Sequence, residues 1–177
     1  TVDIRQEKRT GRNVVARLQG DNTKGKPAIV IGAHVDHLGR GVGASSLARE
    51  EEKGQIHYGA DDNASGVAGL LEIAQHLTNL HTKGQLPLQR NVIFVAWSGE
   101  EMGLLGSKYF TRTFGGESQE RTSLRPAIAA YLNMDMIGRL EKNLIIQGIG
   151  SSSSWLAAIE RFNMPIGLPI TVQNDSY

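Results

Sequence analysis

Two short apolar runs on either side of a helical repeat constrain the fold of this chain more than any other feature. Residues 28–32 (A-I-V-I-G) and 91–97 (N-V-I-F-V-A-W) are nearly continuous apolar runs, typical of strands buried on both faces. Between them, apolar residues recur at helical spacing, at Val67, Leu70, Leu71, Ala74 and Leu77. Asp62, Asn63 and Ser65 offer capping side chains just before this repeat. A strand, a helix and a second strand in this order predict an α/β fold.

Weaker patterns add further elements along the chain. Residues 13–18, 128–136, 143–147 and 168–172 are predicted strands, and helices are predicted from about residue 104 and after the serines 151–154. Residues 1–4 and 13–18 are expected to pair as an antiparallel hairpin at a sheet edge, and the polar segments 39–58 and 113–126 to be surface excursions. We therefore expect one domain over residues 1–177, with three α/β/α layers around a mostly parallel or mixed central sheet.

The composition excludes several classes of function. The chain has 19 basic and 18 acidic residues, so it has no basic excess of the kind found in nucleic-acid-binding proteins. Because it has no cysteine, only His, Asp and Glu are left as metal ligands. Its apolar runs are shorter than the roughly 20 residues of a membrane-spanning helix, so no membrane segment is expected. The chain begins at Thr1 without a signal-like segment, as expected of a processed product or of a piece of a longer protein.

Acidic and histidine residues stand at the ends of the predicted strands. G-A-H-V-D-H at 32–37 follows the first buried strand, and G-A-D-D-N-A-S-G at 59–66 precedes the helix. Glu100 and Glu101 follow the second buried strand, and Asp135 lies within the predicted third strand. Ligands of α/β sheets gather at the carboxyl ends of strands. We therefore expect these side chains to lie close together.

A divalent metal site is the simplest account of this convergence. Each motif alone has an ordinary explanation, because a His after a strand often serves a loop and an Asp before a helix often caps it. Asp135 is harder to explain in this way, since it interrupts an apolar strand pattern in which an unpaired carboxylate is unfavourable. His34 and Asp36 share one side of an extended chain, which suits a ligand and a carboxylate that orients it. Imidazole combined with carboxylate oxygens suits zinc, with manganese or cobalt also chemically possible.

The motifs resemble those of a known enzyme family. G-A-H-V-D-H, G-A-D-D-N-A-S-G, S-G-E-E-M-G-L-L-G-S and Y-L-N-M-D-M-I-G occur in the order typical of co-catalytic di-zinc exopeptidases of the bacterial leucyl aminopeptidase type, and the resemblance covers residues 13–138. It implies a three-layer α/β/α fold and a zinc metallopeptidase, specifically an aminopeptidase that hydrolyses N-terminal residues from peptide substrates with a metal-bound water and a Glu general base. It also implies two zinc ions per complete site and a secreted or periplasmic location.

The resemblance implies a role for each site residue. The metal ligands that it implies are His34, Asp62, Glu101 and Asp135. His34 and Asp135 would hold one zinc and Glu101 the second, with Asp62 bridging the two. Asp36 would orient His34, and Glu100 would be the catalytic general base. Adjacent glutamates can divide the tasks of ligand and base because neighbouring side chains on a turn point in different directions.

One ligand of the family pattern is missing from this chain. The second zinc requires a further His in a loop beyond residues 168–172, and the chain stops at Tyr177, so we expect one complete and one incomplete zinc site in a domain truncated at its C-terminal end. His57, His76 and His81 do not match that motif. His37 is expected to serve its loop.

Other functions on the same fold remain open at this point. The chain could be a non-catalytic, receptor-like relative, an acyl-transferring cyclase or a carboxypeptidase-like hydrolase. Glu100 favours an enzyme, because a binding module has no need of a base beside the metal.

Overall fold

The chain forms two compact units, Thr1–Met136 and Ile137–Tyr177. The computed structural model describes residues 8, 10–41, 49–52, 54–114, 124 and 127–175. In the first unit the elements are β1 (Val14–Leu18), β2 (Ala28–His34), η1 (Glu50–Glu52), η2 (Ala60–Ser65), α1 (Gly66–Thr82), β3 (Val92–Trp97), α2 (Leu105–Thr113) and β4 (Ile128–Asn133). In the second unit they are β5 (Leu144–Ile146), η3 (Ile149–Ser151), α3 (Trp155–Asn163) and β6 (Ile170–Val172). No helix among these residues is long and apolar enough to cross a membrane.

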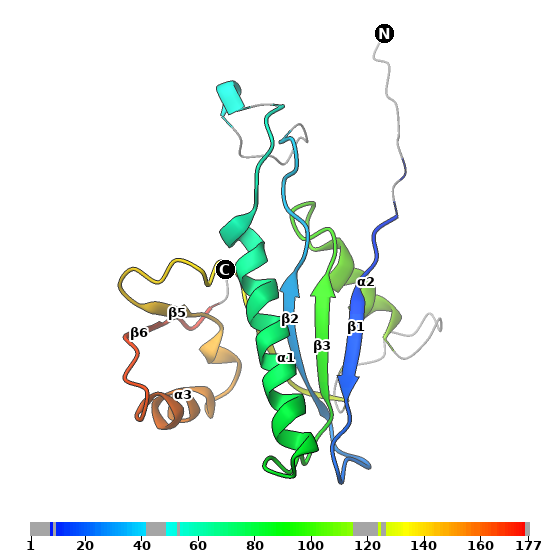
Figure 1. Cartoon of the computed structure of the whole chain (residues 1–177), viewed down its shortest axis with the longest axis vertical. Coiled ribbons are helices and arrows are strands. Elements are labelled where there is room, and N and C mark those ends of the chain that lie inside the picture. Colours follow the sequence, from blue (N-terminus) through cyan, green and yellow to red (C-terminus); the bar gives the residue numbers. More distant parts are fainter. Residues whose placement is uncertain are drawn as a thin grey trace. The chain divides into compact units, whose positions relative to one another are not determined.

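The two apolar runs of the sequence form the centre of the main sheet. Among the described residues, four strands pair in the order β1-β3-β2-β4, with β2 parallel to both β3 and β4. β1 runs antiparallel to β3 (Figure 1). The predicted partner of β1, residues 1–4, lies outside the described residues. The sheet is therefore mixed and mostly parallel, as predicted.

Helices cover both faces of this sheet. On one face, α1 presents Leu70, with Val67 and Leu77 beside it, to Ile31 and Phe94 of the central strands. The periodic apolar residues that predict α1 thus include its packing face. On the other face, Phe110 of α2 packs with Val30, Val95 and Trp97. This arrangement confirms the three-layer α/β/α architecture.

β4 ends before the position that the sequence predicts. The strand was expected to continue to residue 136 and to contain Asp135, but it ends at Asn133, so Asp135 lies just beyond the strand. The amide of Met134 still donates to the carbonyl of Gly32 on β2 at 2.9 Å. The carbonyl of Met134 then accepts from the side chain of Asn63, which is not part of the sheet. Because the carbonyl of Met134 binds a side chain instead of a neighbouring strand, the strand pairing ends here. Asp135 is therefore not held in the regular geometry of the strand.

The second unit has a small sheet of its own. β5 and β6 pair in parallel, and the connection between them contains α3. The sequence predicts both strands and the helix, but it places the strands in the central sheet, and the described residues instead show a separate two-stranded sheet. The predicted surface excursions, 39–58 and 113–126, fall partly outside the described residues.

Candidate metal centre

His34 is the buried centre of the candidate site. It is the last residue of β2, and its side chain is 2% exposed. Its Nδ1 donates to the main-chain carbonyl of Asp36 at 3.0 Å, which assigns the proton to Nδ1 and leaves Nε2 as the acceptor or ligand atom. Nε2 lies 3.2 Å from Oδ1 of Asp62 and 3.4 Å from Oδ1 of Asp135. One imidazole therefore faces two carboxylates from different parts of the chain, one in η2 and one just beyond β4.

A third carboxylate faces the same nitrogen from farther away. Oε2 of Glu100 lies 3.9 Å from His34 Nε2, beyond hydrogen-bonding distance. Burial lowers the pKa of His34, but the nearby charges of Asp135, Glu100 and Asp62 outweigh it, and the net shift is upward. Burial raises the pKa of Glu100 and also that of Asp135, and in both cases His34 opposes the shift. The cluster thus concentrates negative charge around one buried imidazole.

Asp36 holds the turn that carries the two glutamates. Its carboxylate accepts from the main-chain N–H of Glu100 at 3.0 Å and from that of Glu101 at 3.3 Å. The resemblance implies that this carboxylate orients His34, yet Oδ1 of Asp36 lies 3.9 Å from His34 Nδ1. The carbonyl of the same residue makes the contact with the ring. Asp36 therefore touches the imidazole through its main chain and the Glu100–Glu101 turn through its side chain.

A second group of possible ligands shares Asp62 with the first. His37 Nδ1 lies 2.7 Å from Oε1 of Glu101 and 3.7 Å from Oδ2 of Asp62. Oδ1 of Asp62 faces His34, whereas Oδ2 faces His37. The two groups, each with its ligand atoms within 4.8 Å of one another, are His34, Asp62 and Asp135, and His37, Asp62 and Glu101. A carboxylate with one oxygen in each group is suited to bridge two cations.

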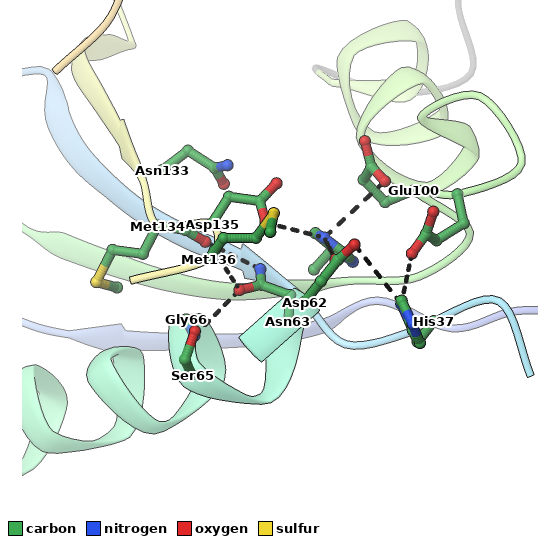
Figure 2. Close-up of polar contacts among 12 residues, drawn as sticks. His37, Asp62, Asn63, Ser65, Gly66, Glu100, Asn133, Met134, Asp135 and Met136 are labelled. Carbon is green, nitrogen blue, oxygen red and sulfur yellow. Dashed lines mark hydrogen bonds and ion pairs between the residues drawn. The ribbon is translucent and has the colours of Figure 1, made fainter. Parts of the chain in front are cut away.

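Asn63 fixes the two loops that deliver Asp62 and Asp135. Its side chain is almost fully buried, and its Oδ1 accepts from the N–H of Gly66, the first residue of α1, and from that of Met136 (Figure 2). Its Nδ2 donates to the carbonyl of Met134 at 3.0 Å. This amide caps the helix, as the sequence predicts, and also ties the helix to the end of β4. Asp62 is adjacent to Asn63, and Asp135 lies between Met134 and Met136, both of which Asn63 binds.

The distances in the first group fit a zinc ion. Two ligand atoms bound tetrahedrally at zinc–nitrogen and zinc–oxygen bond lengths lie roughly 3.3–3.5 Å apart. The distances of 3.2 and 3.4 Å from His34 Nε2 to its two carboxylate oxygens agree with that spacing to within about 0.1 Å. Glu100, at 3.9 Å, lies outside it. His34, Asp62 and Asp135 would therefore hold the ion, and Glu100 would stay beside it without binding.

The structure brings together all six site residues that the sequence indicates. They are His34, Asp36, Asp62, Glu100, Glu101 and Asp135. It adds His37, for which the sequence predicts only a role in its loop. The histidine spacing within H-V-D-H gave no signal for this contact, because the partner, Glu101, lies 64 residues away.

Among the described residues, the other histidines belong to neither group of possible ligands. His81 lies in α1, where its Nδ1 is 3.0 Å from the carbonyl of Leu86, and His76 is an exposed residue of the same helix. His57 donates through its main-chain N–H to the carbonyl of Gly39. Within the described part of the chain, the buried Nε2 of His57 has no hydrogen-bond partner.

Sequence relatives of this chain are aminopeptidases. The chain is 35% identical over 136 residues to aminopeptidase NAALADL1 of Mus musculus, which covers 77% of this chain and 15% of the mouse protein. It is 32% identical over 147 residues to leucine aminopeptidase 2 of Trichophyton rubrum, which covers 82% of this chain and 24% of the fungal protein. The chain thus spans a quarter or less of the length of these two relatives.

Solved structures share the fold at lower identity. A leucine aminopeptidase precursor from Bacteroides thetaiotaomicron matches 94% of this chain and 58% of its own, with a TM-score of 0.64 and 20% identity. Glutaminyl cyclase from Porphyromonas gingivalis matches 88% of this chain and 51% of its own, with a TM-score of 0.61 and 24% identity. Likeness at these identities shows a shared fold.

The family assignment follows from a match over most of the chain. Residues 13–174 match the model of peptidase family M28. The matched region contains every residue of both groups of possible ligands and parts of both compact units. With its α/β/α fold, its paired ligand groups and its aminopeptidase relatives, the chain belongs to peptidase family M28, a family of metallopeptidases.

Proposed function

We propose that this chain carries the catalytic centre of a zinc-dependent aminopeptidase, which removes N-terminal residues from peptides with Glu100 as the general base. The position of Glu100 carries the proposal: its carboxylate faces the nitrogen of His34 that the first ligand group shares, but at 3.9 Å rather than at the 3.2 and 3.4 Å of Asp62 and Asp135. A carboxylate that is close to a metal and does not bind it is available for proton transfer.

The residues of this chain would divide the reaction between them. When bound, zinc would supply Lewis acidity, which lowers the pKa of water and polarises a peptide carbonyl. His34, Asp62 and Asp135 would hold one ion, and Asp62 with Glu101 would contribute to a second. Oε2 of Glu100 would take a proton from the attacking water and return it to the nitrogen of the leaving amine.

Asp36 would keep the base in its working position. Its carboxylate accepts from the main-chain N–H of both Glu100 and Glu101, so the turn cannot rotate without losing two hydrogen bonds. The proposed ligand and the proposed base therefore move together. Such fixed placement is what general-base catalysis requires, because proton transfer needs close heavy-atom contact.

Matched glutamine variants of the two glutamates test the proposal in the natural full-length protein. Glu100→Gln should keep its zinc content and lower kcat for an aminoacyl anilide by about 10²–10⁴-fold, as expected for loss of a general base. Glu101→Gln should instead lose zinc. Elemental analysis and steady-state kinetics measure the two effects. Equal loss of zinc in both variants would contradict the division between base and ligand.

Product analysis separates peptide hydrolysis from acyl transfer. The solved structures that share this fold include a glutaminyl cyclase. Peptides with N-terminal leucine and N-terminal glutamine should be offered in parallel and their products identified by mass spectrometry. Release of free leucine supports the aminopeptidase. Loss of ammonia from the glutaminyl peptide, without release of any amino acid, would replace it with the cyclase.

A further inference from the structure

The contact of His37 with Glu101 is the shortest between ionisable side chains in either ligand group. His37 follows β2 by three residues, and its Nδ1 lies 2.7 Å from Oε1 of Glu101. The next carboxylate oxygen, Oδ2 of Asp62, is 3.7 Å from the same nitrogen. His37 and Glu101 are about four-fifths buried, so the contact is largely shielded from water. The imidazole of His37 is therefore within hydrogen-bonding distance of Glu101 but not of Oδ2 of Asp62.

These distances indicate a hydrogen bond and not a pair of metal ligands. Two atoms bound to one zinc ion lie roughly 3.3–3.5 Å apart, and His34 keeps to this spacing within about 0.1 Å from both of its carboxylates. A separation of 2.7 Å is too short for that arrangement and is usual for a charge-assisted N–H···O bond. Because an ionised carboxylate can only accept, the proton belongs on Nδ1 of His37, and an Nδ1 that carries a proton cannot bind a metal.

The surrounding residues hold the His37 side chain in place. Gly59 has φ +63, and a Cβ at that position would lie 2.9 Å from both Cβ and Cγ of His37. The ring of His57 packs edge-on at 6.3 Å between centroids. Gly59 also begins the segment that delivers Asp62, since its carbonyl accepts from the N–H of Ala64. The segment that supplies the shared carboxylate thus packs directly on the imidazole that contacts Glu101.

We propose that His37 is a positioning residue, whose Nδ1–H holds the Glu101 carboxylate beside Asp62 for a second metal ion without binding the ion itself. This inference rests on the proposed function, because it requires a metal between Asp62 and Glu101. A carboxylate ligand is oriented by the hydrogen bond that it accepts on one side, and loss of such partners commonly weakens metal affinity by about 10–100-fold. The first ion, held by His34, Asp62 and Asp135, should be affected much less.

Two substitutions of His37 separate positioning from direct ligation. The side-chain amide nitrogen of asparagine falls near the place of imidazole Nδ1, so His37→Asn keeps a donor toward Glu101 but offers no nitrogen ligand. His37→Ala removes the donor. In the natural full-length protein, titration of zinc against a chromogenic chelator should show that His37→Ala weakens the second ion by about 10–100-fold and that His37→Asn restores it to within about threefold.

A spectroscopic measurement gives a second, independent readout. In protein loaded with cobalt at both positions, the visible absorption bands report the ligands of the ion. His37→Asn should keep the bands of the parent protein, because the ligand set is unchanged. A changed spectrum together with equal loss of the second ion in both variants would show that His37 is a ligand and would overturn the proposal.

Controls separate failure of this inference from failure of the proposed function. His76→Ala removes an exposed imidazole of α1 and should leave both affinities unchanged. If the parent protein binds two ions and His37→Ala binds them equally well, the positioning role is wrong while the proposed function stands. If the parent protein binds no second ion under any condition, the two-metal centre itself is refuted.

Discussion

At the scale of single residues, His34 is the group that the charges of the site surround. Its imidazole is buried and faces three carboxylates, and their combined charge raises its pKa although burial alone would lower it. With a raised pKa, this ring takes up its second proton at higher pH than an ordinary imidazole does. Burial also raises the pKa of Asp135, so this carboxylate takes up protons at higher pH than an exposed one. Zinc must displace these protons to bind.

Zinc affinity should therefore rise with pH and be accompanied by proton release. Both shifts are upward, so the two ligands hold protons to higher pH than ordinary groups do, and the rise should continue above the ordinary imidazole pKa of about 6.5. It should level off only above the raised pKa of His34. Calorimetric titration of zinc at pH 6.5, in two buffers with different ionisation enthalpies, measures the protons released. Identical enthalpies in the two buffers would rule out this competition.

The sequence predicts which residues come together better than it predicts their contacts. Four motifs at strand ends predict the site residues because strand direction and helix caps are local properties of the chain. The contacts of Asp36 and His37 are not local, since each reaches the Glu100–Glu101 turn across more than sixty residues. A carboxylate two residues after His34 looks like its natural partner in the sequence. Only the folded chain shows that the carbonyl takes that place.

At the scale of elements, a glycine in the central strand β2 leaves room for side chains of the two neighbouring strands to meet. Trp97 of β3 donates from Nε1 to the hydroxyl of Tyr131 of β4 at 2.6 Å, and that hydroxyl donates to Asn133. The two side chains meet above Gly32 of β2, where an added Cβ would lie 2.6 Å from Trp97 Nε1 and 2.7 Å from the Tyr131 hydroxyl. The absence of a side chain at Gly32 thus permits the hydrogen bond between Trp97 and Tyr131, which crosses over β2.

Gly32→Ala should destabilise the sheet more than removal of the hydroxyl does. The added methyl group would separate Trp97 from Tyr131 and leave a buried indole N–H without a partner, which costs about 1–3 kcal/mol before any crowding is counted. Tyr131→Phe removes the same hydrogen bond without the crowding. Urea unfolding followed by tryptophan fluorescence should rank the parent protein first, Tyr131→Phe second and Gly32→Ala last. A Gly32→Ala variant as stable as the parent would disprove the steric argument.

The sequence predicts which elements form, but it predicts their partners less well. The buried strands β2 and β3 stand out because both faces are covered, which leaves a continuous apolar run. The sequence of β1, V-V-A-R-L, is compatible with many neighbouring strands, and its pairing with β3 is a long-range choice. β5 and β6 are likewise predicted as strands, but no local pattern shows that they pair with each other.

At the scale of the whole molecule, the possible ligands found among the described residues come from one of the two compact units. They lie between residues 34 and 135, within Thr1–Met136. They follow β2, precede α1, and follow β3 and β4, so a bound ion would link the connections at one edge of the sheet. Repulsion among these carboxylates opposes folding when no cation is present. Metal occupancy should therefore contribute directly to stability.

Removal of metal should lower the unfolding temperature of the chain. Zinc at 100 times its dissociation constant adds about 2.7 kcal/mol to the free energy of unfolding, provided that it binds only the folded state. Calorimetry with zinc and with excess EDTA should show this difference in the parent protein. His34→Ala should unfold at the same temperature in both conditions, whatever its own stability. A zinc-dependent shift that survives in His34→Ala would place the tight site elsewhere.

The parallel connections of the sheet also determine when a metal can take part in folding. Because β2, β3 and β4 run in parallel, each must be joined to the next by a long crossover, and the ligands at their ends meet only after distant segments have paired. Ordering such contacts is slow, since chain entropy is lost before they form. Zinc is therefore expected to bind late in the folding reaction and not to nucleate it. Its effect should appear mainly as a slower unfolding rate, so the metal would increase the kinetic stability of the folded chain.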